Sequence, residues 1–232
     1  MNPPTWMRQL VPPPVRNYFR PLFYRLQTKI EYSQDFYENE YHKGARYRLH
    51  ERTIADLTQE WEAMGWKDKL YRCLDAVDIP LRPKRWLEAA CHHGKTAFWA
   101  SERYPETCFY MFDFSSPAVE FCKKFNPIPE RSVIWQGDLT DIRHGGEGFD
   151  GFFDMITLLD VTEHLPTDIY RKTVAEMYRV CMPGGWLLLK QGHEILPEHI
   201  HILSEEQLVS DFVSAGFRLV QRLPDRTYLL TK

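Results

Sequence analysis

The chain has 232 residues, of which 44% are hydrophobic and 26% charged, and its formal net charge is −3 at neutral pH. This balance is typical of one globular domain with a sizeable core, and it excludes a polyanion-binding protein that is basic over its whole surface. No apolar run approaches the ~20 residues that a membrane-spanning helix needs, and the N-terminus lacks a signal-peptide core. Five cysteines without a C-x-x-C pair indicate free thiols and a cytoplasmic location.

Residues 1–30 differ from the rest of the chain. They contain six prolines, five basic residues and no acidic residue, with aromatic side chains between them. Prolines at this spacing exclude one long helix. The segment is either a tail that packs on the protein body or an arm that contacts a membrane surface, a partner or an anionic substrate. We therefore predict an N-terminal arm and lid over 1–45 and one domain over 46–232.

Two helices are predicted over 46–65 and 67–77, because hydrophobic residues recur there at helical spacing. In the first helix these residues are Leu49, Ile54, Leu57, Trp61 and Met64. We interpret them as core residues and not as cofactor contacts.

From residue 85 onward, predicted strands alternate with predicted helices. The strands are expected over 85–90, 108–114, 131–138, 151–161, 184–192, 217–223 and 226–232. The helices are expected over 95–104, 116–125, 167–181 and 204–216. This order predicts an α/β fold with a doubly wound, mostly parallel, seven-stranded sheet, in which the final hairpin supplies one antiparallel strand.

The first strand of this sheet leads into a turn with the sequence "LEAACHHGKT". In open parallel sheets, ligands bind beyond the carboxyl ends of the strands, and a glycine turn lets the backbone approach them. Gly94 suits that purpose and Ala90 is nearly as small, whereas His92 stands where glycine is expected. His92 either crowds the ligand, points away from it or donates a hydrogen bond to it, and both His92 and His93 are alternatively a tolerated variant of the turn.

Two further strand ends carry acidic residues. Asp113, followed by Phe114, ends the second strand, where a carboxylate can accept both hydroxyls of a ribose. Asp138 and Leu139 follow the third strand, where they can frame an adenine ring. These features predict a nucleoside-binding site.

The motifs occur in an order that resembles the class I S-adenosylmethionine-dependent methyltransferases. They are "LEAACHHG", Asp113, "GDL", "FDMITLLDVTEHL", "RVCMPGGWLLL" and "HILSEEQLVSDFVSAGFRLV". The resemblance covers about 85–232 and implies a Rossmann-like fold, S-adenosylmethionine as the cofactor, and methyl transfer. The cofactor contacts that it implies are Glu88, Ala90, His92, Gly94, Asp113, Phe114, Asp138, Leu139, Leu159 and Asp160.

Candidate catalytic residues follow the fourth and fifth strands. They are Asp160, Glu163 and His164 after the fourth strand, and His193, Glu194, His199 and His201 after the fifth. In one interpretation His164 or His193, with Glu163, takes the proton from an oxygen nucleophile. In a second, Asp160, Glu163, His164 and His199 hold a divalent metal, a pattern that resembles small-RNA 2′-O-methyltransferases and quinone-pathway O-methyltransferases. In a third, Glu163 and His164 only cap the next helix.

The expected substrate is a small hydroxylated metabolite, sugar or lipid precursor, because a nucleic-acid partner would require a basic face. The lid comes either from the N-terminal segment or from a second subunit of a homodimer. An aromatic wall is expected from Tyr32, Phe36, Tyr37, Tyr41 and Tyr47. The alternatives are a metal-assisted enzyme that acts on RNA ends and, because of His92, a catalytically silent binding subunit.

Overall fold

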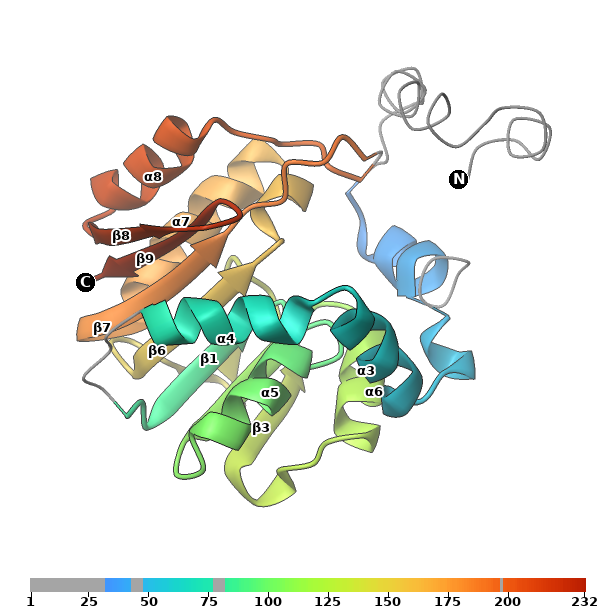
Figure 1. Cartoon of the computed structure of the whole chain (residues 1–232). Helices are drawn as coiled ribbons and strands as arrows, with labels where there is room; N and C mark the ends of the chain where they lie inside the picture. The colour runs from blue at the N-terminus through green and yellow to red at the C-terminus, as the bar shows by residue number, and fades with distance from the viewer. Residues whose placement is uncertain (1–31, 43–47, 77–81, 197) are drawn as a thin grey trace.

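The computed structural model describes residues 32–42, 48–76, 82–196 and 198–232. Its centre is a seven-stranded sheet in the order β3-β2-β1-β6-β7-β9-β8 (Figure 1). Neighbouring strands are parallel except that β9 runs antiparallel to both β7 and β8. This confirms the predicted α/β sheet with one antiparallel strand. The arm over 1–30 and the predicted boundary between residues 45 and 46 lie outside the described residues.

Apart from the start of the first helix, the predicted elements agree with the observed ones to within a few residues at each end. The sheet strands are β1 Arg85–Ala89, β2 Cys108–Asp113, β3 Ser132–Gln136, β6 Phe153–Leu159, β7 Cys181–Lys190, β8 Arg218–Leu223 and β9 Thr227–Thr231. The α-helices are α3 Ile54–Ala63, α4 Trp66–Ala76, α5 Lys95–Arg103, α6 Ser116–Lys124, α7 Thr167–Val180 and α8 Glu205–Ser214. Shorter helices are η1 Phe36–His42, η2 Leu49–Glu51, η3 Pro129–Arg131 and η4 Thr162–His164.

Helices cover both faces of the sheet, because successive side chains of each buried strand point to opposite faces. Trp86 of β1 packs in one cluster with Phe98 of α5. The next residue, Leu87, packs in another cluster with Met177 of α7 and Phe212 of α8. Both β1 side chains are fully buried, and burial of a large apolar side chain contributes ~1.5–3 kcal/mol. Figure 1 shows α4 and α5 in front of the sheet and α7 behind it.

The carboxyl ends of the parallel strands meet at one edge of the sheet. Ala89 at the end of β1 lies beside Phe112 of β2, and Leu159 at the end of β6 lies beside Lys190 of β7. The chain winds from β1 toward β3 on one side and continues with β6 on the other side of β1. This reversal creates the crevice in which open α/β sheets bind ligands.

The first predicted helix differs from the structure at its start. It begins at Ile54 and not at residue 46, because Thr53 and Asp56 form a reciprocal capping box at its N-terminus. Leu49 and Leu57 are buried as predicted, whereas Met64 is 52% exposed. Met64 lies in the turn after α3, so the helical spacing no longer directs its side chain to the core.

The glycine-rich segment before β6 contains secondary structure where the sequence analysis predicts no element. It contains a two-stranded ribbon, β4 Arg143–His144 and β5 Glu147–Gly148. Gly145 and Gly146 have φ values of 60° and 86°, a conformation that glycine adopts without steric cost. The paired glycines therefore form a hairpin turn and are not part of an irregular loop.

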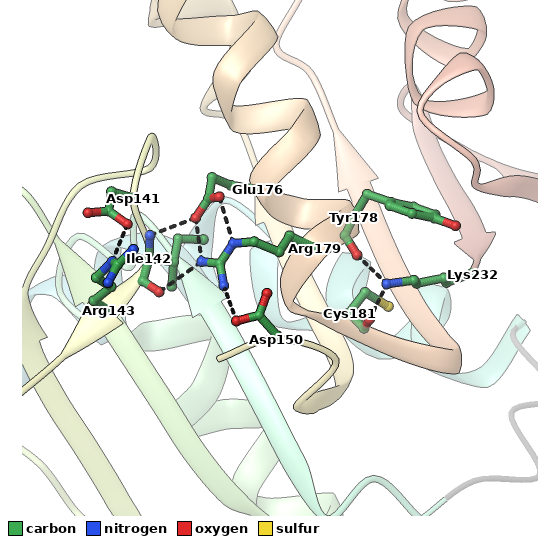
Figure 2. A network of polar contacts seen from close by, with 9 residues as sticks. All are labelled: Asp141, Ile142, Arg143, Asp150, Glu176, Tyr178, Arg179, Cys181 and Lys232. Atoms are coloured by element: carbon green, nitrogen blue, oxygen red, sulfur yellow. Dashed lines mark hydrogen bonds and ion pairs between the residues drawn. The ribbon is translucent and has the colours of Figure 1, made fainter. Parts of the chain in front are cut away.

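A polar network holds the end of α7 at the opposite edge of the sheet (Figure 2). The Arg179 guanidinium donates to Glu176 at 2.6 Å and to the carbonyl of Ile142 at 3.1 Å. Lys232 Nζ donates to the carbonyls of Tyr178 and Cys181 at 2.7 and 2.9 Å. Carbonyls at a helix C-terminus lack partners within the helix, so the C-terminal lysine satisfies α7 and fixes β9 against it.

Within the described ranges, no helix has the length and apolarity required to cross a membrane. The cysteines at 73, 91, 108, 122 and 181 are all free, as the sequence predicts.

Candidate active site

A cavity of about 650 Å³ lies at the carboxyl ends of the parallel strands, within the ~300–1,000 Å³ that ligand pockets span. Nine of the ten predicted cofactor contacts line it: Glu88, Ala90, His92, Asp113, Phe114, Asp138, Leu139, Leu159 and Asp160. The candidate catalytic residues Glu163, His164, His193 and His199 line the same cavity. The fold thus brings residues that are up to 111 positions apart, from Glu88 to His199, into one continuous space.

Gly94 is the one predicted contact that does not line the cavity. A Cβ at this position would lie 2.5 Å from Cys122 Sγ and 2.9 Å from Phe98 Cζ. Gly94 also has a φ of 74° and precedes the first residue of α5. This glycine is therefore required by the close packing of α6 on α5 and by the turn itself, and not by the approach of a ligand.

The turn after β1 keeps a left-handed backbone at positions that lack glycine. Ala90 and His92 have φ values of 55° and 52°, a conformation that costs a non-glycine residue ~1–2 kcal/mol. The backbone N–H of His92 offsets part of this cost, because it donates to Asp113 Oδ2 at 2.9 Å. The turn therefore has the backbone shape of the glycine turn that the resemblance predicts, although Ala90 and His92 carry side chains where glycine has only a hydrogen atom.

The two histidine rings of this turn pack toward α3 and leave the cavity open. The His93 side chain is 1% exposed, and its ring meets Trp61 edge to face at 4.4 Å between centroids. The His92 ring lies 6.2 Å from Trp61 and 4.6 Å from His42 of η1. Burial lowers the pKa of His93 well below its usual value, so this ring is neutral.

Asp113 is buried at the end of β2. Its carboxylate accepts hydrogen bonds from the backbone N–H groups of His92 and Ser115, both at 2.9 Å. Burial raises the pKa of Asp113 to about 6, and these hydrogen bonds oppose the rise. Each carboxylate oxygen has a second lone pair, so Asp113 can also accept the hydroxyls of a sugar in the cavity.

Aromatic rings extend this part of the cavity on the side of the N-terminal segment. Tyr32 stacks on Phe114 with a centroid distance of 5.6 Å and an interplanar angle of 7°. Tyr37 lies 5.2 Å from Phe114 and 6.0 Å from the His164 ring. Glu38 and His42 fix this segment to the start of α6, where they bond to Ser116 N at 3.1 Å and to Ser115 Oγ at 2.6 Å.

This arrangement supports the predicted lid for Tyr32 and Tyr37, both of which line the cavity. Phe36 packs on Tyr37 at 5.1 Å, behind the wall that the two tyrosines form. The Tyr41 side chain and the whole of Tyr47 lie outside the described part of the chain.

Glu88 is the other buried carboxylate near the turn. Its Oε2 accepts the backbone N–H of Ala97 in the first turn of α5 at 2.7 Å. Burial raises the pKa of Glu88 to about 8, against the effect of hydrogen bonds from Ala97 and Thr96. A carboxylate, an aromatic stack and a left-handed turn at adjoining strand ends therefore fit a nucleoside with a polar extension.

Three predicted catalytic residues come together beyond the end of β6. One ligand atom from each of Glu163, His164 and His199 lies within 4.8 Å of the other two. Glu163 is 0% exposed; its Oε1 accepts the N–H of Gly192 at 2.8 Å, and its buried Oε2 has no hydrogen-bond partner among the described residues. Burial, with the nearby Asp160, raises the pKa of Glu163 to about 8.

Backbone carbonyls fix the tautomers of both histidines in this cluster. His164 Nδ1 lies 3.2 Å from the carbonyl of Glu198, and His199 Nδ1 lies 2.6 Å from the carbonyl of Glu194. A carbonyl oxygen can only accept, so Nδ1 carries the hydrogen and the lone pair of the neutral ring is on Nε2. Each imidazole can therefore accept a proton or bind a cation through Nε2.

The other candidates lie apart from this cluster. Asp160 is near enough to raise the pKa of Glu163, but it forms an ion pair with Lys190 and does not belong to the set of three ligand atoms within 4.8 Å. His193 and Glu194 are exposed at the rim of the cavity. His201 does not line the cavity; its ring packs on Tyr170 at 4.8 Å, because the chain after residue 199 turns along α7.

Charged, polar and aromatic residues that the sequence analysis did not single out also line the cavity. They are Trp66, Lys69, Arg72, Lys95, Lys190, Asp225 and Thr227. Lys190 could have been identified, because it ends the strand next to Asp160, where the tips of parallel strands meet. The others come from α4, α5 and the β8–β9 turn, and no local pattern in the sequence indicates their convergence.

Comparison with known proteins agrees with this geometry. A family model described as "Methyltransferase domain" matches residues 87–185. The zebrafish tRNA N(3)-cytidine methyltransferase METTL2 is 28% identical over 84% of this chain and 67% of its own length. Human METTL2B is 26% identical over 81% of this chain and 56% of its own length. This chain thus spans between about half and two thirds of those relatives.

Solved structures share the fold at low sequence identity. Human N-acetylserotonin methyltransferase, solved in complex with SAM, superposes with a TM-score of 0.64 at 16% identity, over 98% of this chain and 68% of that one. A methyltransferase of Haloferax volcanii in complex with the activator Trm112 has a TM-score of 0.62 at 14% identity, over 84% of this chain and 82% of that one. At these identities the likeness concerns the fold alone.

Proposed function

Because this chain belongs to the class I S-adenosylmethionine-dependent methyltransferases, with S-adenosylmethionine as its cofactor, we propose that it methylates an oxygen of a small hydroxylated acceptor. One observation carries the proposal: nine of the ten predicted cofactor contacts and the cluster of Glu163, His164 and His199 line the same cavity. The acceptor is a metabolite, sugar or lipid precursor in this proposal, and His164 accepts its proton.

When bound, S-adenosylmethionine supplies a methyl group activated by a positively charged sulfur. In the proposal, Asp113 accepts the ribose hydroxyls, Asp138 and Leu139 frame the adenine, and Tyr32 and Phe114 form an adjoining aromatic wall. Tyr37 lies between this aromatic wall and His164, and the centroids of the Tyr37 and His164 rings are 6.0 Å apart. The remaining task of the chain is to hold an acceptor oxygen between His164 and the methyl group, since orientation of reactants supplies ~7–11 kcal/mol in well-aligned systems.

Charge distribution supports a small acceptor over a nucleic acid. All 32 acidic residues lie outside residues 1–30, and only five of the 29 basic residues lie inside them. The folded body therefore has an excess of negative charge, which opposes contact with a phosphate backbone. Tyr32 and Tyr37 also narrow the cavity from the side of the N-terminal segment.

Label transfer tests the proposed acceptor class. The protein is incubated with methyl-labelled S-adenosylmethionine and, in parallel, with hydroxylated aromatic acids, sugars or total tRNA. We expect label in one of the small acceptors, in an alkali-stable ether linkage. Label in tRNA alone, removed by nuclease, contradicts the small-acceptor proposal.

A second candidate function is a metal-assisted methyltransferase that acts on RNA, and two observations favour it. The cluster of Glu163, His164 and His199 offers one carboxylate and two imidazoles within 4.8 Å of one another, a donor set that suits a borderline divalent metal such as Zn²⁺ or Mn²⁺. Relatives that cover 81–88% of this chain are named tRNA N(3)-cytidine methyltransferases.

Metal titration tests this second candidate independently of any acceptor. Under it, Zn²⁺ binds one site per chain in calorimetry, and Glu163→Gln weakens binding by at least about tenfold, as loss of a ligand or of its support typically does. His193→Ala is the matched control, because His193 is an exposed histidine at the cavity rim. Absence of Zn²⁺ and Mn²⁺ binding, with label transfer insensitive to a chelator, excludes the metal-assisted mechanism.

A further inference from the structure

One part of the cavity is lined by residues of the α3–α4 corner, of the end of β7 and of the β8–β9 turn. Its apolar wall consists of Trp61, Met64, Trp66, Leu70 and Leu188. Its charged residues are Asp160, Lys190, Lys69, Arg72 and Asp225. We call this part of the cavity the Trp66 compartment. Of these residues, only Asp160 and Leu188 lie in the methyltransferase motifs.

Trp66 holds two ammonium groups at the compartment. Lys190 Nζ lies 4.7 Å and Lys69 Nζ 5.1 Å from the Trp66 ring centroid, both within the ~6 Å of a cation–π contact. Lys190 comes from the end of β7 and Lys69 from α4. The indole therefore orients two positive charges from different elements before any ligand enters.

The carboxylates around these lysines leave one positive charge uncompensated. Lys190 pairs with Asp160, and Lys69 Nζ lies 3.4 Å from Asp225. Arg72, which is exposed, is the third cationic residue of the compartment. Among the described residues of the compartment, Lys69, Arg72 and Lys190 thus stand against two carboxylates, those of Asp160 and Asp225.

Of the other acids that line the cavity, Glu60 of α3 pairs with Arg52, and Glu194 follows β7 and is exposed. The remaining four accept backbone N–H groups or belong to the cluster: Glu88, Asp113, Asp138 and Glu163. Lys95, whose Nζ lies 4.4 Å from the Trp61 ring centroid, adds a further cation and donates to the carbonyl of Leu57.

The Lys69–Asp225 pair is weak enough to be exchanged for a ligand. The Lys69 side chain is 42% and that of Asp225 52% exposed, and ion pairs with such exposure contribute only ~0–1 kcal/mol. An anionic group of a ligand can therefore take the place of Asp225 at little cost. The Lys190–Asp160 pair is more buried, with side-chain exposures of 15% and 31%, and it marks the inner end of the compartment toward the cluster.

We propose that the Trp66 compartment selects an acceptor that carries an anionic group on an apolar or aromatic body, which makes the substrate a hydroxylated organic acid. Lys69 and Arg72 bind the carboxylate, sulfate or phosphate, Trp61, Met64 and Leu70 contact the body, and the hydroxyl faces the cluster. This inference rests on the proposed function and narrows its substrate class. A neutral sugar has no anionic group to pair with the surplus positive charge of Lys69 and Arg72. It also has no apolar body to contact Trp61 and Met64.

A pair of fluorescent probes tests the compartment without knowledge of the natural acceptor. The probes are 8-anilinonaphthalene-1-sulfonate and N-phenyl-1-naphthylamine, which share their rings and differ in the sulfonate. Both are titrated into the full chain saturated with S-adenosylhomocysteine. We expect the sulfonate to bind at least about tenfold more tightly than the neutral probe, the effect of one well-placed charged contact.

Variants locate the anion site within the cavity. Lys69→Met should weaken binding of the sulfonate about fivefold, since the contact replaces a partly exposed ion pair, and Lys69→Met with Arg72→Met should weaken it further. Neither change should alter the affinity for the neutral probe. Lys172→Met is the matched control, because Lys172 is an exposed lysine of α7 that does not line the cavity.

Equal affinities for the two probes, or equal losses for both in Lys69→Met, overturn the inference. Displacement of the sulfonate by tRNA and not by hydroxylated aromatic acids overturns it as well, because the anion would then be an RNA phosphate. Calorimetry with S-adenosylhomocysteine is carried out first. A failure at that step refutes the proposed function, whereas a failure of the probes with cofactor binding intact refutes only the anionic acceptor.

Discussion

Replacement of Asp113 by alanine should weaken binding of S-adenosylhomocysteine by about 1.5–3 kcal/mol, which is the range for hydrogen bonds to a charged group. Asp113 is buried at the end of β2 and lines the cavity. Its oxygens are held by two backbone N–H groups, so the carboxylate is oriented before the sugar arrives. Isothermal titration calorimetry at pH 7.5 measures the loss, and unchanged affinity in Asp113→Ala refutes this placement of the ribose.

Asp154→Ala is the matched control for this experiment. Asp154 also accepts two backbone hydrogen bonds, from Lys84 and Arg85 at 2.9 Å each, but it lies near the start of β1, away from the cavity. Its loss should lower the melting temperature without changing cofactor affinity. If Asp113 only supported the backbone, Asp113→Ala would behave like Asp154→Ala. Loss of cofactor affinity can therefore be separated from loss of stability.

The pH dependence of binding provides a second readout. Because burial raises the pKa of Asp113 to about 6, the carboxyl is increasingly protonated below that pH and then accepts fewer hydrogen bonds. Wild-type affinity for S-adenosylhomocysteine should therefore fall about tenfold between pH 7.5 and pH 5, and Asp113→Asn should lose most of this dependence. Glu88 lines the same cavity, but its pKa is raised to about 8, so its titration is centred above this pH range.

Much of the fold follows from local patterns in the sequence. The strands β1, β2 and β6 are short runs of mostly buried side chains with an acidic residue within one position of their carboxyl ends. This pattern predicts both the sheet and the edge at which we expect the ligand to bind. The first predicted helix is too long at its N-terminus, because hydrophobic residues continue at helical spacing before Thr53, whereas the capping box makes Thr53 the N-cap at which the helix begins. Spacing alone contains no information about a cap formed by a threonine and an aspartate.

The candidate site was predictable only where its residues lie at strand ends. Asp113, Glu163 and His164 follow strands of the sheet, so their meeting follows from the topology. The role of Gly94 depends on Cys122 and Phe98, which approach from α6 and within α5, and this packing is invisible in the linear pattern. The same holds for Trp66 and Lys69, since the position of α4 over the cavity is set by tertiary packing.

Replacement of His164 by alanine should have the largest effect on turnover. A general base typically contributes about 10²–10⁴-fold, so kcat on an acceptor found by label transfer should fall by that range. Affinity for S-adenosylhomocysteine should change less than about twofold, because His164 belongs to the acceptor side of the cavity in the proposed arrangement. His50→Ala, at an exposed histidine of η2, is the control and should leave both quantities unchanged.

Chemical rescue separates a base from a structural histidine at this position. Imidazole added to His164→Ala can enter the space that the ring leaves and accept the proton in its place, so turnover should rise with imidazole concentration. A residue that only supports the fold gives equal losses in turnover and cofactor affinity, and no rescue.

Metal coordination by the cluster predicts a different result. In that case His199→Ala reproduces the loss of turnover seen in His164→Ala, Zn²⁺ binding falls in both variants, and imidazole restores metal binding together with turnover. Measurement of Zn²⁺ binding in the same samples therefore decides between proton acceptance by His164 and metal coordination by the cluster.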